Sequence, residues 1–225
     1  MASILRLAFL ALCLGLIGFL GLPNAGLAQG DATNNSQPSA QALGTPAGKL
    51  IQNLGDKAIS VIANSSLSED QRESKFRELL RNSFDLMTIG RFVIGRSWNA
   101  ATPEQQKDYM HLFEELVVKT YASRLTIYTG EGFRVTSERP EGDKDFIVNS
   151  QITHPDGSEP TEIDWRVRQK SDKLGIIDVM VEGVSLSVTQ RQEYAAVIQR
   201  NGGDIGPLLD LMRQRLQEPS PPTPN

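Results

Sequence analysis

The chain is poor in the residue types on which most catalytic and metal-binding sites depend. It has one cysteine and two histidines among its 225 residues. Cys13 lies inside an apolar N-terminal run, so the remainder of the chain can form no disulfide and offers no thiolate nucleophile. His111 and His154 stand alone, which excludes the usual zinc spacings, and the acidic residues follow no calcium-loop pattern. We therefore expect no metal and no cofactor.

An excess of positive charge is also missing. The formal net charge is −4, which argues against nucleic acid as a partner and against electrostatic adhesion to anionic membranes. Long apolar runs are absent except for residues 7–22, which follow Arg6 and precede Gly26-Leu27-Ala28. This order is typical of a cleavable secretory signal, and the run is shorter than the ~20 residues of a spanning helix. We predict a signal peptide over residues 1–28.

Two polar segments set the limits of the folded part. Residues 29–44 are rich in Ala, Asn, Gln, Ser and Thr, and this composition predicts a disordered spacer. Residues 218–225 include four prolines, so this tail cannot continue a helix and is also expected to be disordered. Residues 45–217 between them have a length that suits a single domain.

Helix start signals divide the first half of this domain. Thr-Pro at 45–46 supplies a cap and a proline at the first helical position, and Ser-x-x-Gln at 68–71 forms a capping box. Asp85 can cap a short helix over residues 86–94. The stretch Thr-Pro-Glu-Gln at 102–105 combines a cap, a proline at the first helical position and a capping box, and it begins a long helix. Its apolar stripe is wide enough to be buried on two sides.

After Gly130 the apolar residues recur at every second position, which indicates strands. The pattern predicts four of them, near 133–136, 146–152, 162–168 and 175–182, with Ile177 and Val179 on the inward face of the last. Consecutive strands with short links make an antiparallel meander. Two helical segments follow. We predict an α+β fold in which N-terminal helices pack on one face of a four-stranded antiparallel sheet that two C-terminal helices close.

The turn Gly-Val-Ser-Leu-Ser at 183–187 partly matches the strand-to-helix turn that holds the nucleophile of many hydrolases. The full motif is Gly-x-Ser-x-Gly, whereas its last position here is Ser187, and no histidine follows His154 as that fold requires. The sheet also reads as antiparallel. We therefore interpret Gly183 as the turn residue and Ser187, with Gln190, as a helix cap, and we predict that the chain is not an enzyme.

Three stretches resemble the MlaC family of periplasmic lipid carriers, also called the toluene-tolerance family. They are DVMVEGVSLSVTQRQEY from Asp178, FDLMTIGRFVIGRSWNAATPEQQKDYMHLFEELVVKTYASRL from Phe84, and GGDIGPLLDLM from Gly202. The likeness extends from about Ala47 to Leu216, and the three stretches occur in the family's order and spacing.

The resemblance implies a periplasmic carrier of phospholipid, which is a cargo and not a cofactor. Such carriers exchange lipid with an inner-membrane ABC transporter complex and an outer-membrane lipoprotein–porin complex, and thereby maintain outer-membrane lipid asymmetry. A close branch of the family is associated with hopanoids, so a hopanoid cargo is an alternative. A noncatalytic periplasmic adaptor that only recruits membrane complexes is a second alternative.

Apolar residues on both halves of the domain are candidates for lipid binding. On the sheet they are Phe133, Val135, Phe146, Val148, Trp165, Val167, Ile177 and Val179, and on the helices they are Phe92, Trp98, Phe113, Val117 and Tyr121. Burial of each methylene contributes about 0.8 kcal/mol, so apolar walls suffice to hold acyl chains. We predict that the sheet face and the long helix share the cavity while the two terminal helices seal it. The same side chains would also suit an ordinary core.

Overall fold

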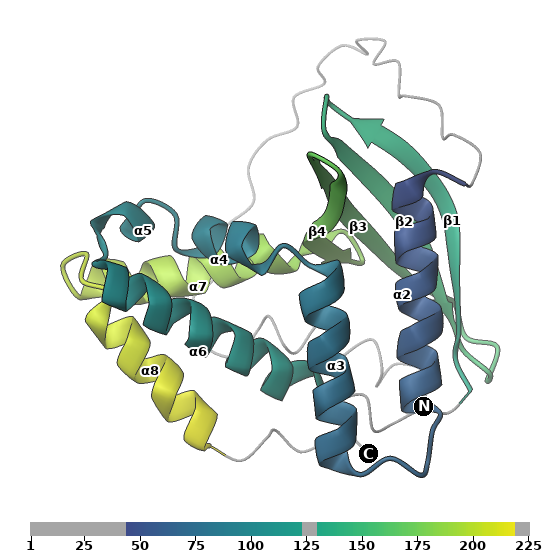
Figure 1. The fold of residues 1–225 in the computed structure, drawn as a ribbon, viewed down its shortest axis with the longest axis horizontal. Helices are drawn as coiled ribbons and strands as arrows, with labels where there is room; N and C mark the ends of the chain where they lie inside the picture. The colour runs from purple at the N-terminus through teal and green to yellow at the C-terminus, as the bar shows by residue number, and fades with distance from the viewer. Residues whose placement is uncertain (1–43, 123–129, 219–225) are drawn as a thin grey trace, which may run out of the picture.

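The computed structural model describes residues 44–122 and 130–218 (Figure 1). In these ranges the helices are α2 (Pro46–Ile62), α3 (Glu69–Ser83), α4 (Leu86–Ile94), α5 (Ser97–Ala100), α6 (Pro103–Ala122), α7 (Leu186–Arg200) and α8 (Gly206–Gln217). The predicted signal peptide (1–28), nearly all of the spacer (29–44) and nearly all of the tail (218–225) lie outside the described residues. None of the described helices is both long enough and apolar enough to span a membrane.

The sheet has one strand more than the sequence predicted. Its order is β1 (Gly132–Glu141), β2 (Asp145–Thr153), β3 (Thr161–Lys170), β4 (Lys173–Val181) and β5 (Val184–Ser185), and every neighbouring pair is antiparallel. The α+β class is confirmed, but the number of strands was wrong. The fifth strand was missed because two residues are too few to show an alternating pattern. Glu182 and Gly183 connect it to β4 and have φ values of 49° and 77°, as a two-residue hairpin turn requires.

Helix α2, at the start of the domain, covers the inner face of the sheet. It lies along β1 and also contacts β2 and β4 (Figure 1). The long helix α6 was predicted to share a cavity with the sheet, but it packs mainly against α8 and α3. Its apolar stripe is buried on two sides as predicted, although both neighbours are helices.

The core is accordingly divided into two main clusters. The sheet cluster joins α2 to the sheet, and its fully buried members include Ile51, Val148, Val167 and Ile176. The helical cluster joins α4, α6, α7 and α8 around Tyr109, whose ring contacts those of Trp98, Phe113 and Tyr194. A small third cluster of Leu80, Val118 and Ala122 lies where α3 meets α6. Each half of the domain therefore has its own buried interior.

One β-bulge changes which residues of β4 face inward. Trp165 pairs with Val179 and Val167 pairs with Ile176, so Ile177 is the additional residue between them. Ile176 is completely buried in the sheet cluster, whereas Ile177 is only half-buried. The predicted unbroken alternation that placed Ile177 on the inward face is therefore wrong. Hydrophobic periodicity alone does not reveal a bulge.

Candidate functional site

The inner face of the sheet carries a group of apolar side chains that the fold leaves half-buried. They surround the fully buried centre of the sheet cluster and come from α2, α3, the α3–α4 junction and four strands. We call them the inner apolar surface: Leu50, Leu79, Phe84, Phe133, Phe146, Trp165, Leu174 and Val179. Large side chains that gather on the inner face but keep part of their surface exposed are what a binding site for hydrocarbon needs.

Trp165 is at the centre of this surface. Its ring meets those of Phe84 and Phe133 edge to face, with centroid distances of 6.5 and 6.4 Å. Its indole Nε1 donates a hydrogen bond of 2.8 Å to the hydroxyl of Ser150, which donates in turn to the carbonyl of Ile163 at 3.0 Å. Because Ser150 is completely buried, the polar group of the indole is satisfied inside the sheet. The rest of the ring is left to make apolar contacts.

The approach of α2 to this surface depends on a glycine. A Cβ atom added at Gly55 would lie 2.1 Å from the ring of Phe133. No side chain larger than hydrogen fits there unless the ring moves. Glycine in the middle of a helix costs about 1 kcal/mol relative to alanine, and here it lets α2 pack directly on an aromatic residue of β1.

The structure brings together some of the predicted lipid-binding residues and separates others. Those that belong to the sheet cluster are Phe133, Val135, Phe146, Val148, Trp165, Val167 and Val179. Phe113 and Trp98 belong to the helical cluster, Val117 lies between that cluster and α3, and Tyr121 is half-buried on α6. Phe92 is exposed. Sequence reasoning missed the α2 and α3 contributions, although the helical spacing of Leu50 and Leu54 was visible.

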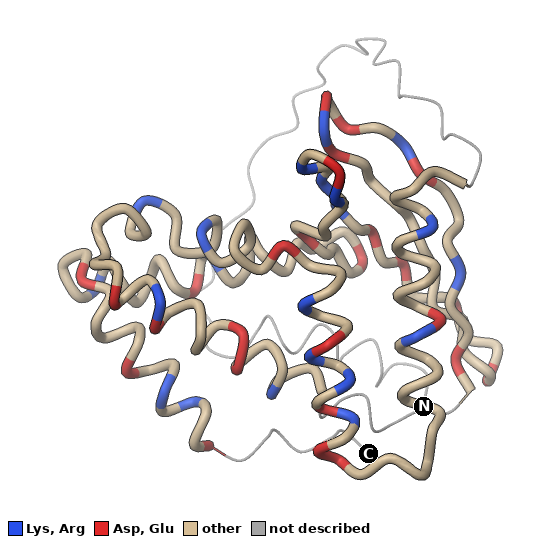
Figure 2. Tube along the Cα trace, viewed as in Figure 1, with Lys and Arg blue, Asp and Glu red and all other residues tan. Residues whose placement is uncertain are grey.

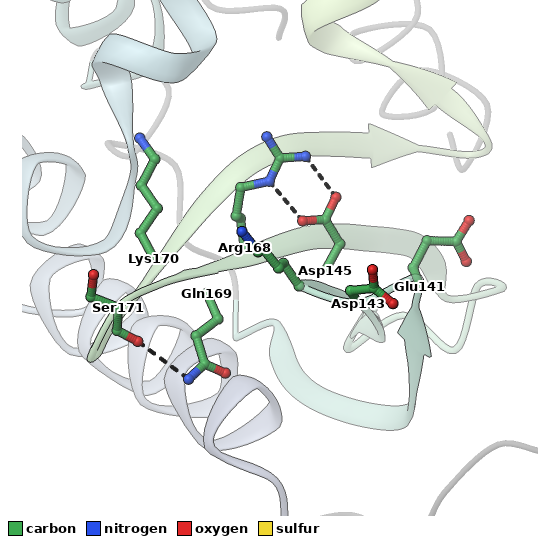
Figure 3. Close-up of a pocket in the computed structure, with 8 residues that line it drawn as sticks. Glu141, Asp143, Asp145, Arg168, Gln169, Lys170 and Ser171 are labelled. Atoms are coloured by element: carbon green, nitrogen blue, oxygen red, sulfur yellow. Dashed lines mark hydrogen bonds and ion pairs between the residues drawn. The ribbon is translucent and has the colours of Figure 1, made fainter.

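A polar cavity of about 930 Å³ lies at the end of the sheet, between the β1–β2 and β3–β4 hairpins (Figure 3). Asp145 in its wall is almost fully buried and accepts hydrogen bonds from Arg168, at 2.7 and 2.8 Å, and from Arg166, at 2.8 Å. Hydrogen bonds from Arg168 are the main reason that the pKa of Asp145 is lowered. Charged groups of both signs line the hollow (Figure 3), so it does not suit acyl chains.

The serines of the strand-to-helix turn form a cap. Ser185, the N-cap residue of α7, accepts a hydrogen bond from the amide of Val188 at 3.1 Å and donates one to Asp178 at 2.6 Å. The prediction that Ser187 is the cap was wrong, because the short β5 shifts the helix start and leaves Ser187 buried. The ring of His154 is hydrogen-bonded to Thr161. This is the geometry of a capped helix and not of a nucleophile with its base.

Replacing Ser185 by alanine is expected to lower the free energy of unfolding by about 1 to 2 kcal/mol, because the cap of α7 is lost. Urea denaturation measures this loss, and Ser65→Ala, a substitution at an exposed turn position, is the matched control. If Ser185→Ala instead abolished turnover of a chromogenic ester by the protein without changing stability, the capping interpretation would be wrong.

The part of the chain that the structure describes holds no cluster of three or more His, Cys, Asp or Glu side chains that could bind a metal ion. The side chains of the inner apolar surface suit contact with an apolar ligand.

Comparisons with known proteins agree with this geometry. Residues 52–214 match the family model of the MlaC protein. The intermembrane phospholipid transport system binding protein MlaC of Haemophilus influenzae is 27% identical over 177 residues, which cover 76% of this chain and 82% of that protein. Toluene tolerance protein ttg2D of Pseudomonas putida is 25% identical over 110 residues, which cover 49% of this chain and 51% of that protein.

A solved structure of a phospholipid-binding protein from Ralstonia solanacearum, in complex with a phospholipid, has the same fold. Its TM-score is 0.64 and its identity 26%, and the match covers 75% of this chain and 95% of that one. The family match spans most of the domain, and the resemblance noted in the sequence motifs is confirmed. The chain belongs to the MlaC family.

Proposed function

We propose that this protein is a phospholipid carrier that holds acyl chains against the inner apolar surface and moves lipid between two membranes. The observation that supports the proposal most directly is the half-buried ring cluster of Phe84, Phe133 and Trp165 on the inner face of the sheet. The same fold in the Ralstonia solanacearum protein holds a phospholipid. No catalytic group is needed for such a function.

Energetics explain why a carrier must enclose its cargo. A phospholipid with about 30 chain methylenes would cost roughly 24 kcal/mol to leave in water, at about 0.8 kcal/mol for each methylene. The binding free energy of the tightest noncovalent complexes is about −18 to −21 kcal/mol. The protein therefore has to offset most of the transfer cost, but not all of it. Partial shielding also favours release, because a carrier that bound its lipid too tightly could not deliver it.

The division of the core offers a route for the acyl chains. The sheet cluster and the helical cluster each contain fully buried residues, and the half-buried Phe84 packs against both the sheet cluster and the small third cluster. Acyl chains that enter along this boundary would meet Trp165 and Val179 on one side and α3 on the other.

The predicted signal peptide over residues 1–28 and the family relationship support a periplasmic location for this activity. The protein would receive and deliver lipid at an outer-membrane lipoprotein–porin complex and at an inner-membrane ABC transporter complex. A hopanoid carrier would use the same apolar surface, because a polycyclic hydrocarbon also needs walls without unpaired polar groups.

Mass spectrometry of lipid extracted from the purified protein tests the proposal. We expect phospholipid in the extract and a native mass that exceeds that of the polypeptide by one lipid. A hopanoid in place of phospholipid would identify the alternative cargo. Protein that is empty after purification, and that also fails to take up phospholipid from vesicles, would contradict the proposal and favour the adaptor.

A further inference from the structure

A second apolar region, separate from the inner apolar surface, lies on α4 and around the start of α7. Among the residues that the structure describes, the large apolar side chains with high exposure are Met87 at 48%, Phe92 at 42%, Val184 at 44% and Val188 at 42%. The first two lie on α4, and the last two lie on β5 and the first turn of α7. Helices α4 and α7 pack side by side (Figure 1).

Phe92 also lines a hollow with positively charged walls. It has a volume of about 410 Å³ and is lined by Arg91, Phe92, Gly95, Arg96, Trp98, Asn99 and Arg191. Met87 precedes Arg91 by four residues on α4, and Val188 precedes Arg191 by three on α7. Residues with these spacings are neighbours on a helix surface, so an apolar side chain accompanies an arginine on each helix.

The arginines of this hollow are positioned by rings and carbonyl groups. The guanidinium of Arg191 lies 4.9 Å from the ring centroid of Phe92 and donates a hydrogen bond of 2.9 Å to that residue's carbonyl. The guanidinium of Arg91 lies 5.4 Å from the ring centroid of Trp98. A Cβ at Gly95, whose φ is 55°, would come within 3.0 Å of Arg191, so this glycine makes room for the guanidinium.

None of the described residues that line the hollow carries a carboxylate. No acidic residue occurs between Asp85 and Glu104 in the sequence, and the described path from α4 to α5 carries only basic charges (Figure 2). By contrast, the carboxylate of Asp145 holds Arg166 and Arg168 elsewhere in the fold. Hydrogen-bond donors of the hollow arginines therefore remain available to an external anion, and a guanidinium matches the oxygens of a phosphate.

We propose that this region docks the protein on a bilayer that contains anionic phospholipid. The headgroup phosphates bind in the arginine hollow, and Met87, Phe92 and Val188 insert at the boundary between the headgroups and the acyl chains. A bilayer suits these features better than a protein partner does, because apolar side chains next to arginines on helices are typical of membrane-surface helices. The negative net charge that argued against membrane adhesion is distributed elsewhere, so the local charge of this region decides its partner.

This docking face is distinct from the site proposed for the cargo, since α4 and α7 belong to the helical cluster. Vesicle sedimentation of the purified protein tests it, with vesicles of phosphatidylcholine alone or with added phosphatidylglycerol. We expect wild-type protein to bind only the anionic vesicles, and less tightly as salt is raised. Arg96→Gln with Arg191→Gln is expected to weaken binding about 25-fold, from about five-fold for each basic residue.

The matched control is Arg134→Gln with Arg200→Gln, which removes the same charge at exposed positions elsewhere and is expected to change binding less than two-fold. Met87→Ser tests the apolar part, because Phe92 also positions Arg191, and it should weaken binding to anionic vesicles. Urea denaturation and the content of co-purified lipid verify that each variant is folded and still carries cargo. The proposal is wrong if the control pair weakens binding as much as the arginine pair does. It is also wrong if wild-type protein does not bind anionic vesicles, even if it binds a protein partner.

Discussion

Replacing Glu138 by alanine is expected to lower the free energy of unfolding by about 3 kcal/mol at neutral pH, because the donors at the start of α2 lose a charged acceptor. Glu138 is 1% exposed. Its Oε1 accepts hydrogen bonds from the amides of Gly44 and Thr45 at 2.9 and 2.7 Å, and its Oε2 accepts one from the hydroxyl of Thr45 at 2.5 Å. The carboxylate also lies at the positive end of the helix dipole.

Urea denaturation at neutral pH measures the loss. Glu141→Ala, which removes an exposed carboxylate from the same strand, is the control and should change stability by less than about 1 kcal/mol. A loss no larger in Glu138→Ala than in Glu141→Ala would show that the buried carboxylate does not hold α2 to the sheet.

A glycine of α2 provides a second measure of the same contact. A Cβ at Gly48 would lie 2.3 Å from Oε2 of Glu138, so Gly48→Ala should destabilise the wild-type protein. In the Glu138→Ala background this conflict is absent, and the higher helix propensity of alanine, about 1 kcal/mol, should make the same substitution stabilising. A change of sign between the two backgrounds is the coupling that a double-mutant cycle detects.

The protonation of Glu138 predicts how stability depends on pH. Burial alone would raise the pKa of this carboxyl, but the hydrogen bonds from Thr45, Gly44 and Gly48 outweigh burial and hold the pKa below its usual value. A carboxyl whose pKa is lowered in the folded state contributes its full stability above the unfolded value, about 4.3, and loses it as the pH falls further. Glu138→Gln should therefore reduce the acid sensitivity, while Asp85 and Asp145, whose pKa values are also lowered, retain part of it.

Local signals in the sequence predicted most element boundaries correctly. The cap at Thr45, the capping box at Ser68 and the start of the long helix at Pro103 are all confirmed. Such signals involve residues within one turn of each other, so no knowledge of the tertiary fold is needed. The two-residue strand β5 and the cap at Ser185 depend instead on a hairpin turn and on Asp178 of the neighbouring strand β4.

Pairings between distant segments could not be predicted in the same way. An apolar stripe shows that a helix face is buried but does not name its partner, and both α2 and α6 have such a stripe. The stripe of α6 faces α8 and α3, so Phe113 joined Tyr109 in the helical cluster and not the sheet. The predicted inward residues of β1, β2 and β3 were better placed, because strict alternation assigns every second residue to one face.

Substituting tryptophan for Val179 is expected to lower the content of co-purified phospholipid and to weaken the binding of a fluorescent phospholipid analogue by about fifty-fold. Val179 is half-buried on the inner apolar surface and pairs with Trp165 across β3 and β4. An added indole would displace roughly three methylenes of an acyl chain, and at about 0.8 kcal/mol each their loss corresponds to about 2.4 kcal/mol of binding free energy.

The same substitution in an ordinary core would have a different result. Overpacking a filled interior costs about 1 to 3 kcal/mol of stability and would not alter lipid content. Gln151→Trp adds the same ring on β2, on the face of the sheet opposite to that of Val179. It controls for the added surface and should leave lipid binding unchanged. If Val179→Trp is destabilised but carries as much phospholipid as the Gln151→Trp control, then the inner apolar surface is structural and the acyl chains bind elsewhere.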